Sequence, residues 1–270
     1  MFQQLVVPVD GSAVSASVIP MAIEFAAAVD GHVDVVTSID ASGNRKASAA
    51  RLSSALAEVP DPAVEIRTHE LIAESPGMGI AEFVESSPGS MVMMSSHGHG
   101  RSAAVLGSAT DDVLRRTFGP VIVIGAKTDR TNPRLDGEYV VGVDGSHRSE
   151  TLLPFVEAWA IEFGGVPWIV EAIAGPRGTD TEVWRSTYPD HLATQLRERT
   201  GHRVEAQVVY GVRPADAIVG FAAERSASLI FATTHGRTGL KRLRSGSVAA
   251  EIVRNSPCPV VLSRPPNVEP

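Results

Sequence analysis

The chain has 270 residues, of which 43% are hydrophobic, and a formal net charge of −7, so it is long enough for two domains of ordinary size. It is a poor candidate for nucleic-acid binding, because phosphate neutralisation needs clustered Lys and Arg. A single cysteine, Cys258, excludes an internal disulfide and a cysteine-rich metal site. Because no apolar run could span a membrane and no signal peptide is evident, we expect a cytoplasmic protein without a membrane partner.

Short apolar runs alternate with amphipathic stretches through the first half of the chain. The pattern predicts strands at 5–9, 33–39, 64–71, 91–94 and 121–124, and helices at 14–29, 51–58, 78–85 and 109–116. Pro8 gives up a donor to the sheet, but it lies near the end of its strand, where that loss is easier to tolerate.

The second half shows the same alternation. We expect strands at 139–143, 168–173, 204–210, 229–232 and 260–262, and helices at 150–163, 189–200, 214–225 and 247–255. Nearly continuous apolar strands that alternate with helices indicate α/β domains with a parallel sheet covered on both faces. A polar segment with Pro and Gly at 127–137 predicts a linker between a first domain at 1–126 and a second at 138–270.

The two halves repeat the same landmarks in the same order, which indicates a duplicated domain. The segment Val-Asp-Gly-Ser occurs at 9–12 and at 143–146, and a His-Gly pair at 97–98 recurs at 235–236. Asp10 and Asp144 lie 134 positions apart, whereas Gly107 and Gly246 lie 139 apart. The last change of offset falls inside a Gly-rich loop, which is one residue shorter in the first copy.

Asp10 and Asp144 follow the first strand of each half. In open α/β sheets ligands bind at the carboxyl ends of the strands, where a carboxylate can accept hydrogen bonds from ribose hydroxyls or an exocyclic amine. The alternative is that each Asp caps the next helix or closes its own turn. Taken alone, the Asp-Gly-Ser segment favours that alternative.

The Gly-rich loop of the second half has the chemistry of a phosphate site. Gly236 is followed by nine residues and then by Gly246 and Ser247, which open a helix. Small residues let phosphate oxygens approach the backbone, and a helix N-terminus presents N–H groups and a partial positive charge. Cations surround the loop at Arg237, Lys241, Arg242 and Arg244. The serine also fits a helix N-cap, but a cap explains neither the preceding glycine nor the cations.

The Asp-Gly-Ser segment, combined with a loop of the form Gly-x2-Gly-x9-Gly-Ser, resembles the universal stress protein family. The resemblance covers nearly the whole chain as two tandem copies and is strongest at 235–240, 246–249 and 258–261. It implies two Rossmann-like domains, each with a five-stranded parallel sheet of order 3-2-1-4-5. In the nucleotide-binding branch it implies ATP or a related nucleotide (ADP or AMP), commonly with a divalent cation such as Mg²⁺. The Asp then serves the adenosine end, and the loop serves the phosphates.

The resemblance assigns nucleotide-binding residues in both copies. They are Asp144, Thr233, Gly236, Arg237, Gly246, Ser247 and Val248 in the second copy, and Asp10, Ser95, Gly98, Gly107 and Ser108 in the first. Two departures weaken the match. Ser95 and Thr233 stand where the motif has its first glycine, and neither takes positive φ as easily as glycine does. The first loop also has only eight residues between Gly98 and Gly107. We therefore rank the second site as the more intact and favour degeneration of the first over binding in an altered pose.

Catalysis is not evident in the sequence. The loop lacks the Gly-Lys-Ser/Thr of a Walker A motif, no Gly-x-Ser-x-Gly elbow is present, and His97 and His99 lack the nearby carboxylates of a metal site. The leading hypothesis is an adenine-nucleotide-binding sensor or regulator of the stress response. A slow ATPase and a scaffold without nucleotide are the alternatives. The resemblance further implies that the last strands of the two halves pair as an internal pseudo-dimer, and it leaves a homodimer open.

Overall fold

The computed structural model describes residues 2–39, 45–57, 59, 64–98, 106–117, 119–131, 133–175, 181–234 and 247–265, with residues 45, 181–186 and 247 described by their backbone alone. The chain divides into two compact units. Unit 1 comprises 1–126 with 130–133, and unit 2 comprises 127–129 with 134–270. Among the described helices, none has the length and apolar character needed to cross a bilayer.

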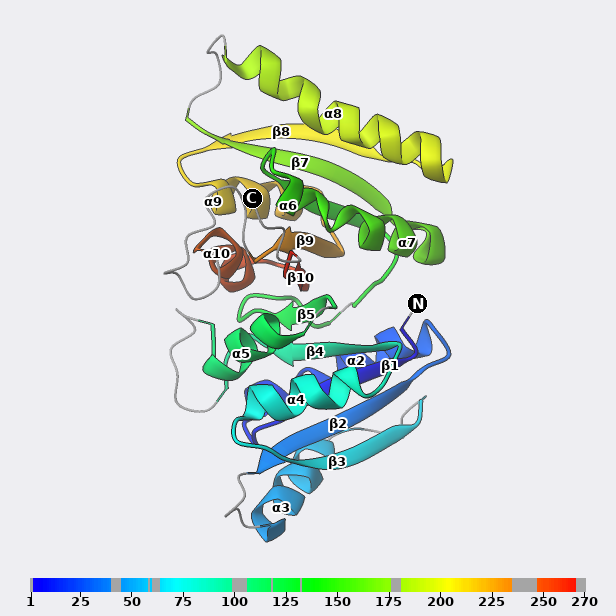
Figure 1. Cartoon of the computed structure of the whole chain (residues 1–270), viewed down its shortest axis with the longest axis vertical. Coiled ribbons are helices and arrows are strands. Elements are labelled where there is room, and N and C mark those ends of the chain that lie inside the picture. Colours follow the sequence, from blue (N-terminus) through cyan, green and yellow to red (C-terminus); the bar gives the residue numbers. More distant parts are fainter. Residues whose placement is uncertain are drawn as a thin grey trace. The chain divides into compact units, whose positions relative to one another are not determined.

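Unit 1 is a parallel sheet with helices on both faces (Figure 1). Its strands are β1 (Gln4–Pro8), β2 (His32–Ile39), β3 (Ile66–Ile72), β4 (Ser90–Ser95) and β5 (Val121–Ile124), in the order β3-β2-β1-β4-β5. Its helices are α1 (Ala13–Ala16), α2 (Ile19–Ala27), α3 (Arg45–Leu56), α4 (Pro76–Glu85) and α5 (Ser108–Arg116). Helices α2 and α3 pack on β1 to β3, whereas α4 packs against α5 and on the other face of β2 to β4. Pro8 is the last residue of β1, as predicted.

Unit 2 repeats this architecture. Its strands are β6 (Glu138–Val143), β7 (Val166–Ala174), β8 (Glu205–Gly211), β9 (Leu229–Thr233) and β10 (Val260–Ser263), in the order β8-β7-β6-β9-β10. Its helices are α6 (His147–Glu150), α7 (Leu153–Phe163), α8 (Thr181–Thr200), α9 (Pro214–Glu224) and α10 (Ser247–Asn255). Both units have the predicted strand order 3-2-1-4-5, so the expected pair of Rossmann-like domains is confirmed.

Prolines lie at three of the differences from the predicted helices, and the helix expected at 51–58 also begins earlier than predicted, at Arg45. Each of the helices expected at 14–29 and 150–163 is divided into two shorter helices. Pro20 lies in the first turn of α2 and Pro154 in the first turn of α7, where the missing N–H costs little. The helix expected to begin at Pro189 instead begins at Thr181, so that start was wrong. Pro189 is buried inside α8, and the packing of α8 on β7 and β8 compensates for the lost backbone hydrogen bond.

A buried carboxylate lies within the sheet of unit 1. The side chain of Asp34 is 1% exposed. Its Oδ1 lies 2.5 Å from His69 Nε2, and its Oδ2 accepts a hydrogen bond of 2.5 Å from Gln4 Nε2 and lies 3.2 Å from His32 Nε2. The ring of His69 also lies against Phe83 of α4. Three strands therefore converge on one carboxylate, whose charge depends on these partners for stabilisation.

Cys258 is buried, and burial raises the pKa of its thiol to about 11. We expect it to resist iodoacetamide in the native protein at pH 8 and to be alkylated once in denaturant, because the thiolate is the nucleophile. Below pH 9 the thiol is neutral in both states. Between pH 9 and pH 11 the unfolded thiol is ionised to a greater extent than the native one, so the free energy of unfolding falls as the pH rises. Alkylation of the native protein at the rate of the denatured protein would contradict this prediction.

Candidate functional site

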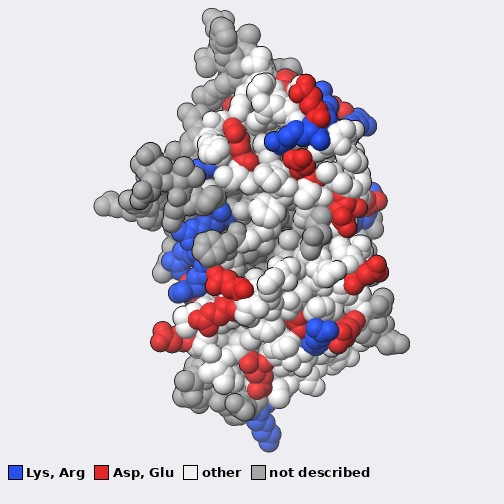
Figure 2. All heavy atoms as spheres, turned by 45° about the vertical axis from the view of Figure 1, so that its right-hand side comes forward, with Lys and Arg blue, Asp and Glu red and all other residues white. Residues whose placement is uncertain are grey.

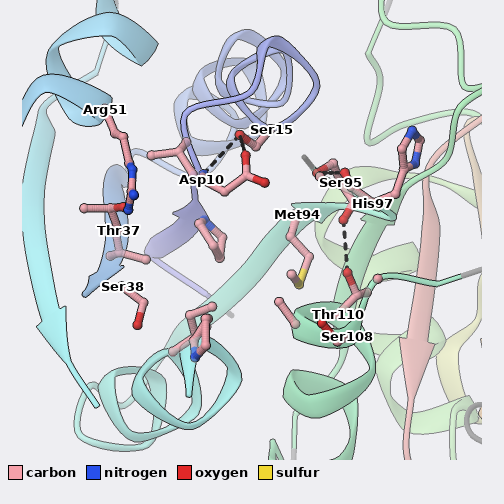
Figure 3. A pocket seen from close by; sticks show the side chains of 18 residues that line it. Asp10, Ser15, Thr37, Ser38, Arg51, Met94, Ser95, His97, Ser108 and Thr110 are labelled. Atoms are coloured by element: carbon pink, nitrogen blue, oxygen red, sulfur yellow. Dashed lines mark hydrogen bonds between the residues drawn. The ribbon is translucent and has the colours of Figure 1, made fainter. Parts of the chain in front are cut away.

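The five residues predicted for the first site line one cavity in unit 1. The cavity measures about 300 Å³ and lies at the carboxyl ends of β1, β2 and β4. It brings together residues that are distant in the sequence, namely Asp10, Ser95, Gly98, Gly107 and Ser108. Figure 3 shows Ser95, Ser108 and Thr110 on one side, Thr37, Ser38 and Arg51 on the other, and Asp10 between the two groups. This placement follows the rule for ligand sites in open α/β sheets.

Asp10 closes a turn at the edge of the cavity. Its Oδ1 accepts hydrogen bonds from the Ser12 backbone N–H at 3.0 Å, from Ser12 Oγ at 2.6 Å and from Ser15 Oγ at 2.7 Å. Gly11 has a φ of +85°, which an L side chain would strain. The turn-closing role that the sequence offered as an alternative is therefore correct for Oδ1, and Asp10 lines the cavity as well.

Gly98 is in close contact with this carboxylate. A Cβ atom at Gly98 would lie 2.1 Å from Asp10 Oδ2. No side chain fits there unless Asp10 moves, and the hydrogen bonds of Oδ1 hold Asp10 in place. The glycine of the His-Gly pair is therefore required by a tertiary contact with the Asp-Gly-Ser turn.

The N-terminus of α5 opens onto the cavity without a side-chain cap. Gly107 is the N-cap residue and Ser108 is the first helical residue. The Gly107 N–H donates to the Ser96 carbonyl at 2.8 Å, and Thr110 Oγ1 donates to the Ser95 carbonyl at 3.2 Å. These bonds fix the start of α5 to the end of β4. The first turn of such a helix presents N–H groups and a partial positive charge to an anion.

Serine at position 95 is compatible with this geometry. Neither Ser95 nor Thr233 has a positive φ, and each is the last residue of its strand. Ser95 Oγ donates to the His97 carbonyl at 2.9 Å. The replacement of the first motif glycine therefore imposes no backbone strain in either unit.

Helices α4 and α5 both line the cavity and contact each other. Asp112 Oδ2 accepts from Ser75 Oγ at 2.9 Å, and its Oδ1 accepts from Arg116 Nε at 2.8 Å. Burial would raise the pKa of Asp112, but hydrogen bonds from Arg116 and Ser75 outweigh it and lower the pKa. A Cβ atom at Gly77 would lie 2.5 Å from Asp112 Cβ, so the two helices approach closely.

Several cavity residues were not anticipated from the sequence, among them Thr37, Ser38 and Arg51. Thr37 and Ser38 lie near the end of β2, and Arg51 lies on α3. Thr37 and Ser38 could have been anticipated, because they lie near the end of a predicted strand, where ligands bind in such sheets. Arg51 lies on a helix with no clear apolar face, and nothing in the sequence pattern directs its side chain towards the cavity.

Unit 2 repeats the turn but only part of its site is described. Asp144 Oδ1 accepts from the Ser146 backbone N–H at 3.1 Å and from Ser146 Oγ at 2.6 Å, and Gly145 has a φ of +79°. Thr233 ends β9, α10 begins at Ser247, and Val248 is exposed. The remaining predicted residues of this loop lie outside the described residues: Gly236, Arg237, Lys241, Arg242, Arg244 and Gly246.

Opposite charges are interspersed on the face of the molecule drawn in Figure 2. Arg213 pairs with Asp216, and Arg225 pairs with Glu138. Within the described part of the chain, no three His, Cys, Asp or Glu side chains are grouped to hold a metal ion.

Comparisons with known proteins agree with this architecture. The family model described as the universal stress protein family matches residues 1–125 and 139–264. The chain is 32% identical over 205 residues to universal stress protein Rv2005c of Mycobacterium tuberculosis, covering 72% of this chain and 68% of that protein. It is 39% identical over 75 residues to universal stress protein MJ0531 of Methanocaldococcus jannaschii, covering 28% of this chain and 44% of that protein.

A solved structure has the same fold along nearly the whole chain. It is a universal stress protein from Archaeoglobus fulgidus, with a TM-score of 0.67 at 20% identity, covering 98% of this chain and 99% of that one. The family model matches two segments, both units have the same strand order, and one motif set is repeated along the chain. These findings lead to the same assignment. The chain belongs to the universal stress protein family as a member with two tandem copies of the domain.

Proposed function

We propose that this chain binds an adenine nucleotide and acts as a nucleotide-dependent sensor or regulator in the stress response. The observation that carries the proposal is the convergence of the motif residues of unit 1 on one cavity at the carboxyl edge of the sheet. Its volume of about 300 Å³ is within the range of small-molecule sites.

Each part of the cavity suits one part of a nucleotide. The uncapped N-terminus of α5, with Gly107 and the exposed Ser108, suits phosphate oxygens. Asp10 lies between the two ends of the cavity, where its carboxylate can accept hydrogen bonds from ribose hydroxyls. The base then lies towards Thr37, Ser38 and Arg51. A divalent cation such as Mg²⁺ would be held through the phosphates.

The second copy repeats the motif with the longer, more basic loop, so it is the stronger candidate for nucleotide binding. Its turn around Asp144 has the same hydrogen bonds and the same positive φ at the following glycine as the turn around Asp10. We propose that Asp144, Thr233, Gly236, Arg237, Gly246, Ser247 and Val248 surround the nucleotide in unit 2. The proposal assigns no catalytic residue in either unit.

Freshly purified protein is expected to release a nucleotide on heat denaturation, at one or two molecules per chain, and mass spectrometry identifies it. Protein purified without ligand should bind ATP in titration calorimetry. Asp10→Ala and Asp144→Ala should each weaken nucleotide binding in their own unit by at least about tenfold, the value of a hydrogen-bonded charged group.

Asp10→Asn and Asp144→Asn serve as controls, because they keep an acceptor for the turn and remove the charge. Absence of released nucleotide, together with no ATP binding at millimolar concentration, would contradict the proposed function. An ATP affinity that neither Asp→Ala variant changes would contradict the placement of the sites.

A further inference from the structure

The end of the unit 1 cavity furthest from α5 contains a buried hydroxyl. Thr37 is 1% exposed and lines the cavity. Its Oγ1 is buried and has no hydrogen-bond partner among the described residues. Buried hydroxyl groups are nearly always paired, and leaving one unpaired costs stability. A hydroxyl kept in this state at a cavity wall indicates a ligand that supplies the missing partner.

Arg51 lines the cavity together with Thr37. Its Cγ lies 2.9 Å from the position a Cβ at Gly11 would take, so the Asp-Gly-Ser turn supports its aliphatic stem. Figure 3 shows its guanidinium pointing towards Thr37. A guanidinium carries five N–H donors and no acceptor. This end of the cavity therefore presents donors and a positive charge to a ligand.

The second copy has the opposite chemistry at the corresponding strand position. Pro8 pairs with Val36 in unit 1, and Gly142 pairs with Val170 in unit 2. The next residue along the second strand is Thr37 in unit 1 and Glu171 in unit 2, where the Glu171 side chain is 5% exposed.

A second carboxylate of unit 2, that of Glu150, lies close to the Asp-Gly-Ser turn that contains Asp144. Tyr188 of α8 donates a hydrogen bond of 2.9 Å to Glu150 Oε1. Burial, with the carboxylates of Glu150 and Asp144 nearby, raises the pKa of Tyr188. Unit 2 therefore has the carboxylate of Glu150 near its Asp-Gly-Ser turn, whereas unit 1 has the donors of Arg51 near its own turn.

We propose that the two units select different purine bases, and that unit 1 takes a 6-oxopurine nucleotide of the guanine class. A guanine ring presents O6 and N7, two acceptors that a guanidinium can contact together, whereas an adenine ring presents an amine that a carboxylate accepts. Arg51 and Thr37 are the residues that determine specificity in unit 1, and Glu171 has this role in unit 2. This inference rests on the proposed function, because it takes both sites to hold nucleotides.

The test is calorimetry of the full chain with GTP and with ATP. GTP should bind at one site per chain, and Asp10→Ala should abolish that site. Arg51→Ala and Thr37→Val should each weaken GTP binding by at least about tenfold, which is the lower part of the range for base discrimination. Both variants should leave the ATP affinity of the other site within about twofold of the parent value. Arg67→Ala is the charge control, because Arg67 is an exposed cation paired with Glu65 and does not line the cavity.

Thr37→Val separates ligand recognition from damage to the fold. Valine has nearly the shape of threonine and removes an unpaired buried hydroxyl, so the ligand-free variant should melt at or above the temperature of the parent chain. Equal or tighter ATP binding at the unit 1 site, or a GTP-to-ATP preference unchanged in Arg51→Ala, would overturn the inference and leave the proposed function standing. If neither nucleotide binds, both fail.

Discussion

Replacement of Gly98 by alanine is expected to abolish nucleotide binding in unit 1 and to destabilise that unit by about 2 kcal/mol. The added Cβ would lie 2.1 Å from Asp10 Oδ2. Asp10 cannot move aside without giving up hydrogen bonds to Ser12 and Ser15 through Oδ1. The substitution therefore disrupts both the carboxylate proposed for the ribose and the turn that holds it. Calorimetric titration and urea unfolding measure the two effects.

Gly119→Ala is the matched control, because a Cβ at Gly119 in the same unit meets no atom within 4 Å. We expect it to leave both affinity and stability unchanged. Gly107→Ala is informative in a different way. Its Cβ would lie 3.4 Å from the nearest atom, so folding should tolerate it, while the added methyl group lies at the N-cap where phosphates are proposed to approach. A Gly98→Ala chain that binds as tightly as the parent would refute the site in unit 1.

Replacement of His69 by leucine is expected to lower the free energy of unfolding by about 3 kcal/mol, the usual effect of removing one partner from a buried charge. The Asp34 carboxylate is 1% exposed, and His69 Nε2 lies 2.5 Å from its Oδ1. Without that partner Oδ1 stays buried, and Gln4 and His32 remain only at Oδ2. Urea unfolding at pH 7 measures the change.

The double variant Asp34→Leu/His69→Leu tests the cause. With both polar partners replaced by apolar groups, a large part of the lost stability should return, because no uncompensated charge remains. If the double variant is less stable than His69→Leu alone, the loss comes from packing of the ring against Phe83 and not from the carboxylate.

The strands and the turn glycines could be predicted from local sequence alone. Apolar runs such as 121–124 appear as the buried strand β5, because a strand covered on both faces needs apolar residues throughout. The turn needs a positive φ at positions 11 and 145, and glycine adopts that conformation without strain, so these two glycines depend only on the turn itself. The start of α8 could not be predicted, because a proline that normally ends a helix is retained there by packing on β7 and β8.

By itself, the sequence determined the duplication, the strand–helix alternation and the family, since repeats, periodicity and turn chemistry depend on residues close together in the chain. Only the tertiary structure decided which side chains share the cavity. Gly98 is required by Asp10, a residue 88 positions earlier, through a contact between two strand ends. Thr37 and Arg51 enter the site from a second strand and a weakly amphipathic helix. Contacts of this kind depend on how the strands are ordered in the sheet, and local sequence patterns carry no record of them.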